Sequence, residues 1–265
     1  NAINDYFDVR ADRVNRPETL IVGKHVKRRS VIVLHWVLNG LAFGIAIFLS
    51  VRNNTFWYVF VHLVSMNSLW FYSLYLKKKA FYGNFLIAGL TALVPILCGV
   101  HFYKQNSLVW NSIIDNSSFE YWLGILVEDG HFVWLLAFFA FINNFAREII
   151  KDIQDVKGDL LIQAKTLPIQ IGIRKSKIWI GILLLIPLLF FGFLFFWHQG
   201  LIEYGIKDQM LVFAPVVASF LFNLISIGSL YRAKKRSELK FADRWVKLSM
   251  VVGILTPVYW FLVWL

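Results

Sequence analysis

The sequence has little cysteine and little charge. Cys98 is the single cysteine among 265 residues, so no internal disulfide can form and a disulfide-stabilised secreted fold is excluded. Charged residues make up 16% of the chain, against about 25% in soluble domains, while hydrophobic residues make up 58%. This balance excludes a soluble enzyme and a disordered chain.

Two common kinds of functional site are also missing. No glycine-rich phosphate-binding loop appears in the sequence. The six histidines are dispersed and lack the paired spacing of zinc or haem ligands. We interpret them as packing or membrane-interface residues.

The excess of apolar residues is gathered in seven runs of 20 to 22 residues. A bilayer core of about 30 Å is crossed by about 20 helical residues, so each run is long enough to span. The sequence therefore predicts an all-α, polytopic membrane helical bundle. The predicted spans are 31–50, 56–76, 84–103, 131–150, 178–198, 210–231 and 245–264.

The net charge of +11 is explained by membrane topology. If the seven runs span, 24 of the 27 Lys and Arg residues fall on one side, and only Arg52, Lys104 and Lys207 on the other. Positively charged loops stay in the cytoplasm, which orients the chain. We predict a multi-pass protein of the inner or plasma membrane whose partner is the bilayer, not a nucleic acid.

An internal repeat carries most of the acidic residues. Residues 3–12 (INDYFDVRAD) and 150–159 (IKDIQDVKGD) agree at five of ten positions, and the same offset of 147 residues maps the span 31–50 onto 178–197. We interpret the chain as two copies of a four-helix unit, repeat one over 1–103 and repeat two over 131–265, within one domain. The chain starts inside the first copy, so we expect an N-terminal truncation.

Each copy places three aspartates at positions i, i+3 and i+7. These positions lie within about 60° of one another on a helix, so the carboxylates share one face. Such close carboxylates repel one another unless a cation is present, and Mg²⁺ prefers oxygen ligands. Two such clusters predict two Mg²⁺ ions with a diphosphate held between them. The aspartates are Asp5, Asp8 and Asp12 in the first copy and Asp152, Asp155 and Asp159 in the second.

At these residues the chain resembles the UbiA superfamily of intramembrane prenyltransferases. The family motif N-x-x-x-D-x-x-x-D is matched by Asn4, Asp8 and Asp12, and the second motif, D-x-x-x-D, by Asp155 and Asp159. The resemblance covers the whole chain. It implies a nine-helix UbiA-type fold that here lacks the first helix and part of the second.

A third family feature is a Tyr and a Lys at the cytoplasmic end of the fourth family helix. The string YSLYLKKK offers Tyr72 with Lys77, and Tyr75 with Lys79 as the alternative. We favour Tyr72 and Lys77, with Ser73 and Lys78 beside them. Tyr and Lys also concentrate at membrane boundaries, so an anchoring role is the competing interpretation.

The resemblance implies a role for each polar residue of the motifs. Asp8 and Asp12 would bind one Mg²⁺ ion, and Asp155 and Asp159 the other. The predicted catalytic residues are these four aspartates with Lys77 and Tyr72. The predicted diphosphate-binding residues are Asn4, Lys77, Lys78, Arg147 and Lys151. The residues predicted to orient these ligands, without binding the ions or the diphosphate themselves, are Asp5, Asp152, Ser73 and Asn144.

The string NNFAREIIKDIQDVKGD is most similar to the geranylgeranylglycerol-phosphate geranylgeranyltransferase branch. This implies transfer of a prenyl group, geranylgeranyl in that branch, from an allylic diphosphate to a lipid-like glycerol phosphate acceptor. The basic segment 13–29 could bind the acceptor phosphate or could serve topology alone. The alternatives are a prenyltransferase for an aromatic acceptor (4-hydroxybenzoate, homogentisate or a quinone precursor) and a secondary transporter with carboxylate ion sites.

Overall fold

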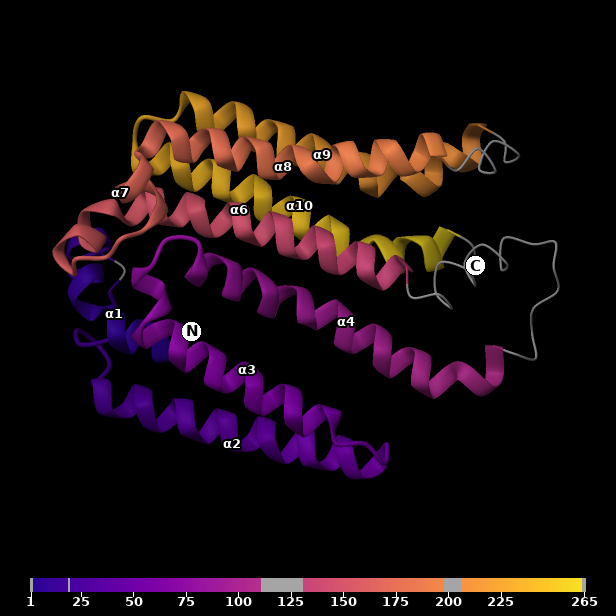
Figure 1. The fold of residues 1–265 in the computed structure, drawn as a ribbon, viewed down its shortest axis with the longest axis horizontal. Helices are drawn as coiled ribbons and strands as arrows, with labels where there is room; N and C mark the ends of the chain where they lie inside the picture. Colours follow the sequence, from indigo (N-terminus) through magenta and orange to yellow (C-terminus); the bar gives the residue numbers. More distant parts are fainter. Residues whose placement is uncertain (1, 19, 111–130, 198–205, 264–265) are drawn as a thin grey trace. The chain divides into compact units, whose positions relative to one another are not determined.

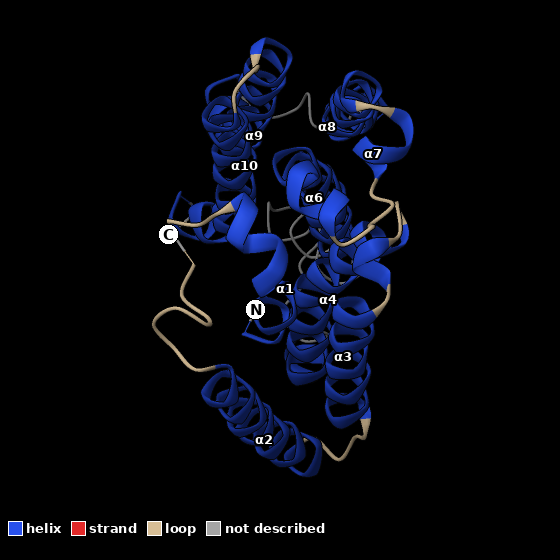
Figure 2. Cartoon of the chain, turned by 90° about the vertical axis from the view of Figure 1, so that its left-hand side faces the viewer, coloured by secondary structure: helices blue, strands red, loops and turns tan. Residues whose placement is uncertain are grey.

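The structure is a computed structural model, and it describes residues 2–18, 20–110, 131–197 and 206–263. Helices and the loops between them make up this part of the chain, and no strand occurs among these residues (Figure 2). The predicted all-α fold is confirmed.

Each predicted span overlaps one long helix, although the span 56–76 extends past both ends of its helix and residues 198 and 264 lie outside the described part of the chain. The apolar runs correctly indicated these elements because their length and composition suit a membrane helix, whose backbone satisfies its own hydrogen bonds. Three further elements were not among the spans: α1 (Ala2–Asn15), the 3₁₀ turn η1 (Leu76–Lys78) and α7 (Leu167–Ile171). The long helices, labelled in Figure 1, are α2 (Arg28–Arg52), α3 (Trp57–Leu74), α4 (Tyr82–Trp110), α6 (His131–Leu161), α8 (Ile173–Trp197), α9 (Ile206–Arg232) and α10 (Arg236–Val263).

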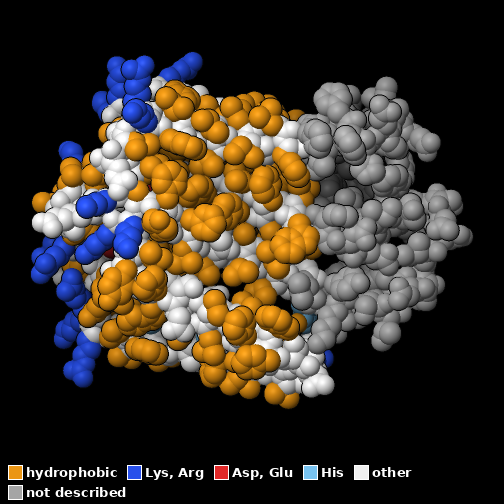
Figure 3. Space-filling view, in the orientation of Figure 1, with side chains coloured by type: hydrophobic (Ala, Val, Ile, Leu, Met, Phe, Trp, Pro, Cys, Tyr) orange, Lys and Arg blue, Asp and Glu red, His pale blue; other side chains and the backbone are white. Residues whose placement is uncertain are grey.

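Four segments of the described chain are long and apolar enough to cross a membrane: Arg28–Arg52, Tyr82–Gly99, Val133–Leu161 and Ala214–Arg232. Large apolar side chains are exposed along these helices, as lipid contact requires, and hydrophobic side chains cover most of the visible described face (Figure 3). The chain is an integral, multi-pass membrane protein. The predicted spans on α3, α8 and α10 stay predictions.

The chain divides into two compact units. The first unit comprises Asn1–Ile87 and Lys151–Ser176, and the second comprises Ala88–Ile150 and Lys177–Leu265. Both aspartate motifs belong to the first unit. The division into repeats, 1–103 and 131–265, stays a prediction.

In the first unit, α1 packs against α2 and α3, which also pack against each other. Val9, Val22 and Val31 form a small buried core with Tyr6 beside it. The backbone N–H of Lys165 donates to the carbonyl of Lys78 at 2.7 Å, which ties η1 to the loop after α6. The turn that carries Lys77 is thereby held beside the end of the second motif.

In the second unit, α9 and α10 pack side by side through small hydroxyl residues (Figure 1). The Ser226 hydroxyl donates to the carbonyl of Ala242 at 3.0 Å, and the Ser219 and Ser249 hydroxyls lie 2.7 Å apart. Short side chains of this kind let membrane helices approach closely and bond across the interface. This contact brings the end of α9 against the start of α10.

Candidate active site

The first aspartate motif lies on α1, with its three carboxylates at different depths. Asp8 is buried, Asp12 is half-buried and Asp5 is exposed. One turn before Asp8, the Oδ1 atom of Asn4 is buried and finds no hydrogen-bond partner among the described residues. A buried amide oxygen costs free energy when it is unpaired, so this atom suits a bound cation or donor.

The second motif lies at the C-terminal end of α6, and its side chains are held by neighbouring polar groups. The Asn84 amide donates to Asp152 Oδ2 at 2.8 Å. Asp159 is buried, and the Thr166 hydroxyl donates to its Oδ2 at 3.5 Å. These contacts orient the acidic face of α6 before any ligand binds.

The helices that carry the two motifs are joined directly by Asn15. Its amide donates to the carbonyl of Asp155 at 3.0 Å, and its Oδ1 accepts from the N–H of Gly158 at 2.8 Å. A Cβ at Gly158 would lie 2.7 Å from the carbonyl oxygen of Ala11, so the two backbones meet there. Ala11 and Gly158 are equivalent positions of the sequence repeat. The two helices therefore cross at these small residues, which brings both acidic faces together within the first unit.

Two cations lie among the motif carboxylates. Lys77 Nζ forms an ion pair with Oδ2 of Asp8 and also interacts electrostatically with Asp12 and Asp159. The Arg16 guanidinium pairs with Oδ2 of Asp155 at 2.5 Å. The four motif carboxylates thus outnumber the two cations, Lys77 and Arg16. This excess of negative charge favours the binding of a further cation.

Burial and mutual repulsion alter the acidity of the first motif. Burial raises the pKa of Asp8, although the Lys77 ammonium works in the opposite direction. Burial, and then the neighbouring Asp8 carboxylate, raise the pKa of Asp12. Both groups therefore hold their protons more tightly than a free aspartate does, as expected of carboxylates that await a cation.

The donor set fits a hard divalent cation. It consists of carboxylate oxygens with the unpaired amide oxygen of Asn4, and Mg²⁺ prefers such ligands. Among the described residues, no three acidic, His or Cys side chains are gathered into a ready-made metal-binding group. Lys77 and Arg16 instead pair with the carboxylates, so a bound ion would compete with them.

Tyr72, Ser73 and Lys78 lie on or just before η1 in the chain. A Cβ at Gly83 would lie 3.1 Å from the Tyr72 ring and 2.8 Å from the carbonyl oxygen of Leu76, so the start of α4 packs tightly on this turn. The Ser73 hydroxyl is buried and donates to the carbonyl of Leu69 at 2.9 Å. Lys78 is exposed, and Lys151 is half-buried at the start of the acidic face of α6. The roles of these residues stay predictions.

Arg147 and Asn144 belong to the second unit, where other side chains bind them. Arg147 Nε lies 3.0 Å from Oδ1 of Asp243, whose Oδ2 lies 2.6 Å from the Lys247 ammonium. The Asn144 amide donates to the Thr91 hydroxyl at 2.8 Å. Their predicted contribution to diphosphate binding stays a prediction.

Four residues of the site lie outside both motifs, and the sequence pattern does not identify their roles: Asn15, Asn84, Thr166 and Arg16. We assigned Arg16 to a basic segment that could bind the acceptor phosphate, but in the structure it pairs with Asp155. The sequence offers one indication of these roles, the distance of Asn15 and Arg16 from the first motif. Asn15 and Arg16 follow Asp12 by three and four residues, close to one turn of the helix.

Comparison with known proteins identifies the family of the chain. The sequence profile of the UbiA prenyltransferase family matches residues 1–251. The chain belongs to the UbiA prenyltransferase family. As a UbiA prenyltransferase, it is an enzyme that transfers prenyl groups.

Several curated relatives of this UbiA chain are digeranylgeranylglyceryl phosphate synthases. The protein of Thermococcus kodakarensis is 29% identical over 96% of this chain and 77% of its own length. That of Pyrococcus horikoshii is 32% identical over 97% of this chain and 80% of its own length. That of Saccharolobus solfataricus is 32% identical over 96% of this chain and 76% of its own length.

A solved structure concerned with digeranylgeranylglyceryl phosphate synthase in membranes has a similar fold. The TM-score is 0.58 at 21% identity, and the match covers 97% of this chain and 78% of that chain. At this identity the likeness concerns the fold, and it confirms the predicted UbiA-type architecture.

Proposed function

We propose that this enzyme transfers a geranylgeranyl group from its diphosphate to the free hydroxyl of geranylgeranylglycerol phosphate and releases diphosphate. The observation that carries the proposal is the Asn15 contact between α1 and α6, which gathers Asp8, Asp12, Asp155 and Asp159 around Lys77. The names of the relatives support this donor and this acceptor.

The four motif aspartates would bind Mg²⁺, Asp8 and Asp12 from α1 and Asp155 and Asp159 from α6. Bound Mg²⁺ would supply positive charge that stabilises the diphosphate as a leaving group. Asn4 could add its unpaired oxygen to the ion on the α1 side.

The chain itself contributes a fixed positive charge at the site. Lys77 stands on a 3₁₀ turn, and the backbone bond from Lys165 to Lys78 holds that turn beside the second motif. When a diphosphate enters, the ammonium of Lys77 can leave Asp8 for a phosphate oxygen and stabilise the charge that develops as the C–O bond breaks. The Asp8 carboxylate is then free for an ion.

The acceptor carries a phosphate of its own, which requires further cations. The segment after the first motif supplies them on α1 and the loop that follows, and Arg16 already lies within the carboxylate set. We place this site at the cytoplasmic face, because the segments predicted on this side of the membrane hold 24 of the 27 Lys and Arg residues.

The test is transfer by the purified chain in lipid nanodiscs. Labelled geranylgeranyl diphosphate, Mg²⁺ and geranylgeranylglycerol phosphate should give one prenylated lipid and one diphosphate per turnover. Chelation of Mg²⁺, Asp8→Asn and Asp155→Asn should each remove this activity. Glu18→Gln is the matched control, because Glu18 is an exposed acid just beyond α1.

The competing functions give different results in the same assay. Transfer to 4-hydroxybenzoate or homogentisate in preference to the glycerol phosphate would make the enzyme an aromatic prenyltransferase. Ion flux in liposomes without diphosphate release would support a transporter. Normal turnover by both Asp variants would reject the carboxylate site itself.

A further inference from the structure

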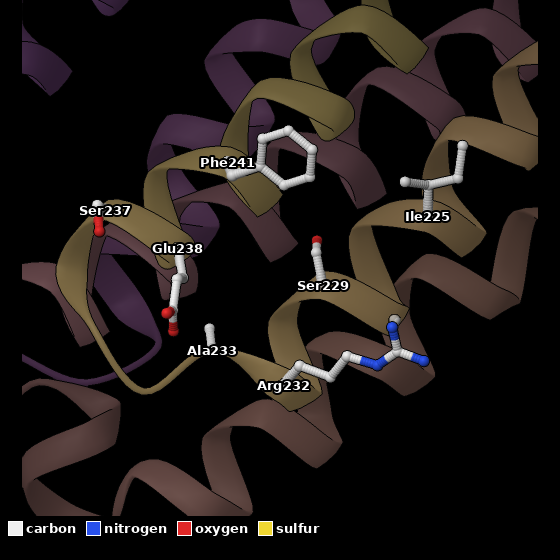
Figure 4. Close-up of a pocket in the computed structure, with 8 residues that line it drawn as sticks. Ile225, Ser229, Arg232, Ala233, Ser237, Glu238 and Phe241 are labelled. Carbon is white, nitrogen blue, oxygen red and sulfur yellow. The ribbon is translucent and has the colours of Figure 1, made fainter.

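A second polar site lies in the second unit, away from the aspartate motifs in sequence. A pocket of about 640 Å³ opens where α9 ends and α10 begins (Figure 4). Neither aspartate motif contributes to its lining. The pocket is lined by Ile225, Gly228, Ser229, Arg232, Ala233, Ser237, Glu238 and Phe241.

The walls of the pocket change from apolar to polar along α9. Ile225, Ser229 and Arg232 are spaced i, i+4 and i+7, so they share one face of the helix, and Phe241 stands opposite on α10 (Figure 4). Ile225 and Phe241 are both exposed, at 42% and 48%. An apolar wall leading to an arginine matches a molecule that has a hydrocarbon tail and a charged head.

The position of the pocket is that of a lipid headgroup. The apolar segment Ala214–Arg232 is long enough to cross a membrane, and it ends at Arg232. The polar end of the pocket therefore coincides with the end of a membrane span. Basic pockets between membrane helices at this depth bind the head groups of anionic lipids.

The charge of the pocket favours an anion. Arg232 is exposed, and no carboxylate of the described chain forms an ion pair with it. Exposed Lys234 and Lys235 follow after Ala233. Glu238 is the acid of the lining, and its Oε2 already accepts from the backbone N–H groups of Lys234 at 2.6 Å and Lys235 at 3.0 Å. The lining and the residues next to it thus hold three cations and one carboxylate, and that carboxylate is engaged in capping α10.

The loop that joins the two walls is held in place. Lys177 of α8 donates to the carbonyl of Ala233 at 2.6 Å, just past the end of α9. Because this contact and the Glu238 cap fix both sides of the turn, the pocket is formed before a ligand arrives.

We propose that this pocket binds the phosphate head group of an anionic membrane lipid, with the hydrocarbon chain lying along Ile225 and Phe241. Arg232 pairs with the phosphate, and the Ser229 oxygen can accept a hydrogen bond from a head-group hydroxyl, since its own hydrogen is donated to the Ser226 carbonyl and its lone pairs stay open. We favour a lipid over a soluble phosphate because the pocket has an apolar wall and lies where the apolar segment Ala214–Arg232 ends.

The test measures binding of phosphatidylglycerol to the whole protein. The purified chain is titrated with this lipid in neutral detergent, and native mass spectrometry gives the dissociation constant for the first bound molecule. Phosphatidylcholine should bind more weakly. Arg232→Gln should weaken phosphatidylglycerol binding about fivefold, the effect of one basic residue at a membrane surface, and should leave phosphatidylcholine binding unchanged.

Lys240→Gln is the matched control, because Lys240 is an exposed cation on α10 outside the lining. It should change the dissociation constant less than twofold. Ser229→Leu fills the pocket without changing charge and should also weaken binding, which keeps the test decisive if Arg232→Gln fails to fold. Equal losses from Arg232→Gln and Lys240→Gln, or displacement of the lipid by excess inorganic phosphate, would overturn the proposal.

Discussion

A single ammonium group connects the two aspartate motifs electrostatically. Lys77 pairs with Asp8 on α1 and interacts with Asp159 on α6 and with Asp12. It comes from a different part of the chain, the turn after α3. One ammonium group thus offsets negative charge in both motifs. Among cations outside the two motifs, Lys77 should therefore be the one whose neutralisation lowers catalysis most.

Lys77→Met should lower kcat about 10²- to 10³-fold, the usual loss when a fixed charge that stabilises a leaving group is removed. Steady-state turnover with saturating donor measures it. Lys79→Met tests the alternative Tyr75–Lys79 assignment and should retain most of the turnover. A larger loss from Lys79→Met than from Lys77→Met would contradict the assignment made here.

Glu238 links the stability of the second unit to pH. Bonds from the backbone N–H groups of Lys234 and Lys235 to its carboxylate lower the pKa of Glu238. A lowered folded-state pKa means that the stabilisation is present above the unfolded-state pKa and is lost as the pH falls through the folded-state value.

Glu238→Gln should therefore unfold at a lower temperature than the unchanged protein at pH 7. The difference in thermal midpoint, measured in detergent by tryptophan fluorescence, should shrink towards zero as the pH falls below the ordinary glutamate value. A difference that stays constant over this pH range would show that the carboxylate charge has no part in the cap.

The motif residues could be predicted one by one, but their partners could not. Spacing alone placed Asp8 and Asp12 on one helical face, because helical periodicity is local. The pairing of Arg16 with Asp155 joins residues 139 positions apart, and no local pattern contains it. The same holds for Arg147, which sequence reasoning assigned to diphosphate and which lies beside Asp243.

Among the helices, the crossing of α1 and α6 has the strictest steric requirement. Gly158 is buried at the crossing, and any side chain there would meet the Ala11 carbonyl and the Asn15 amide. Asn15 makes both of its hydrogen bonds to α6 at the same place. Steric fit and hydrogen bonding thus depend on the same small contact.

Gly158→Ala should force α1 and α6 apart, at a cost of about 1–3 kcal/mol, as for other insertions into a tight contact. The thermal midpoint in detergent should fall, and prenyl transfer should fall with it. Gly44→Ala on α2 is the control, since a Cβ there meets nothing within 4 Å. It should be neutral or stabilise by about 0.5–1 kcal/mol. The opposite ranking of the two variants would refute the close crossing.

Hydrophobic runs predicted where the long helices lie, since a span is recognised by length and composition alone. They could not predict η1 or α7, because these elements of three and five residues are far shorter than a span and their positions depend on tertiary contacts such as the bond from Lys165 to Lys78. The predicted span 131–150 is also shorter than α6. This helix continues to Leu161 and therefore carries the second motif as well.

For the molecule as a whole, the distribution of charge predicts orientation. With Cys98 replaced by Ala, one cysteine can be introduced on either predicted side of the membrane. Lys175→Cys lies on the basic side and Thr55→Cys on the other. A membrane-impermeant maleimide should label Thr55→Cys in intact cells and Lys175→Cys only after permeabilisation. Labelling of both variants from the same side would mean that the number of spans between them is wrong.

Asn15 holds α6 by main-chain atoms alone, the carbonyl of Asp155 and the N–H of Gly158. These two bonds are therefore independent of the side chain at position 155, whereas the ion pair with Arg16 is lost when the carboxylate is replaced. Donor atoms can be exchanged there, a carboxylate for an imidazole or a thiolate, while the Asn15 bonds between the two helices remain. The metal preference of the site can in this way be redesigned without altering the bonds of Asn15 that join α1 and α6.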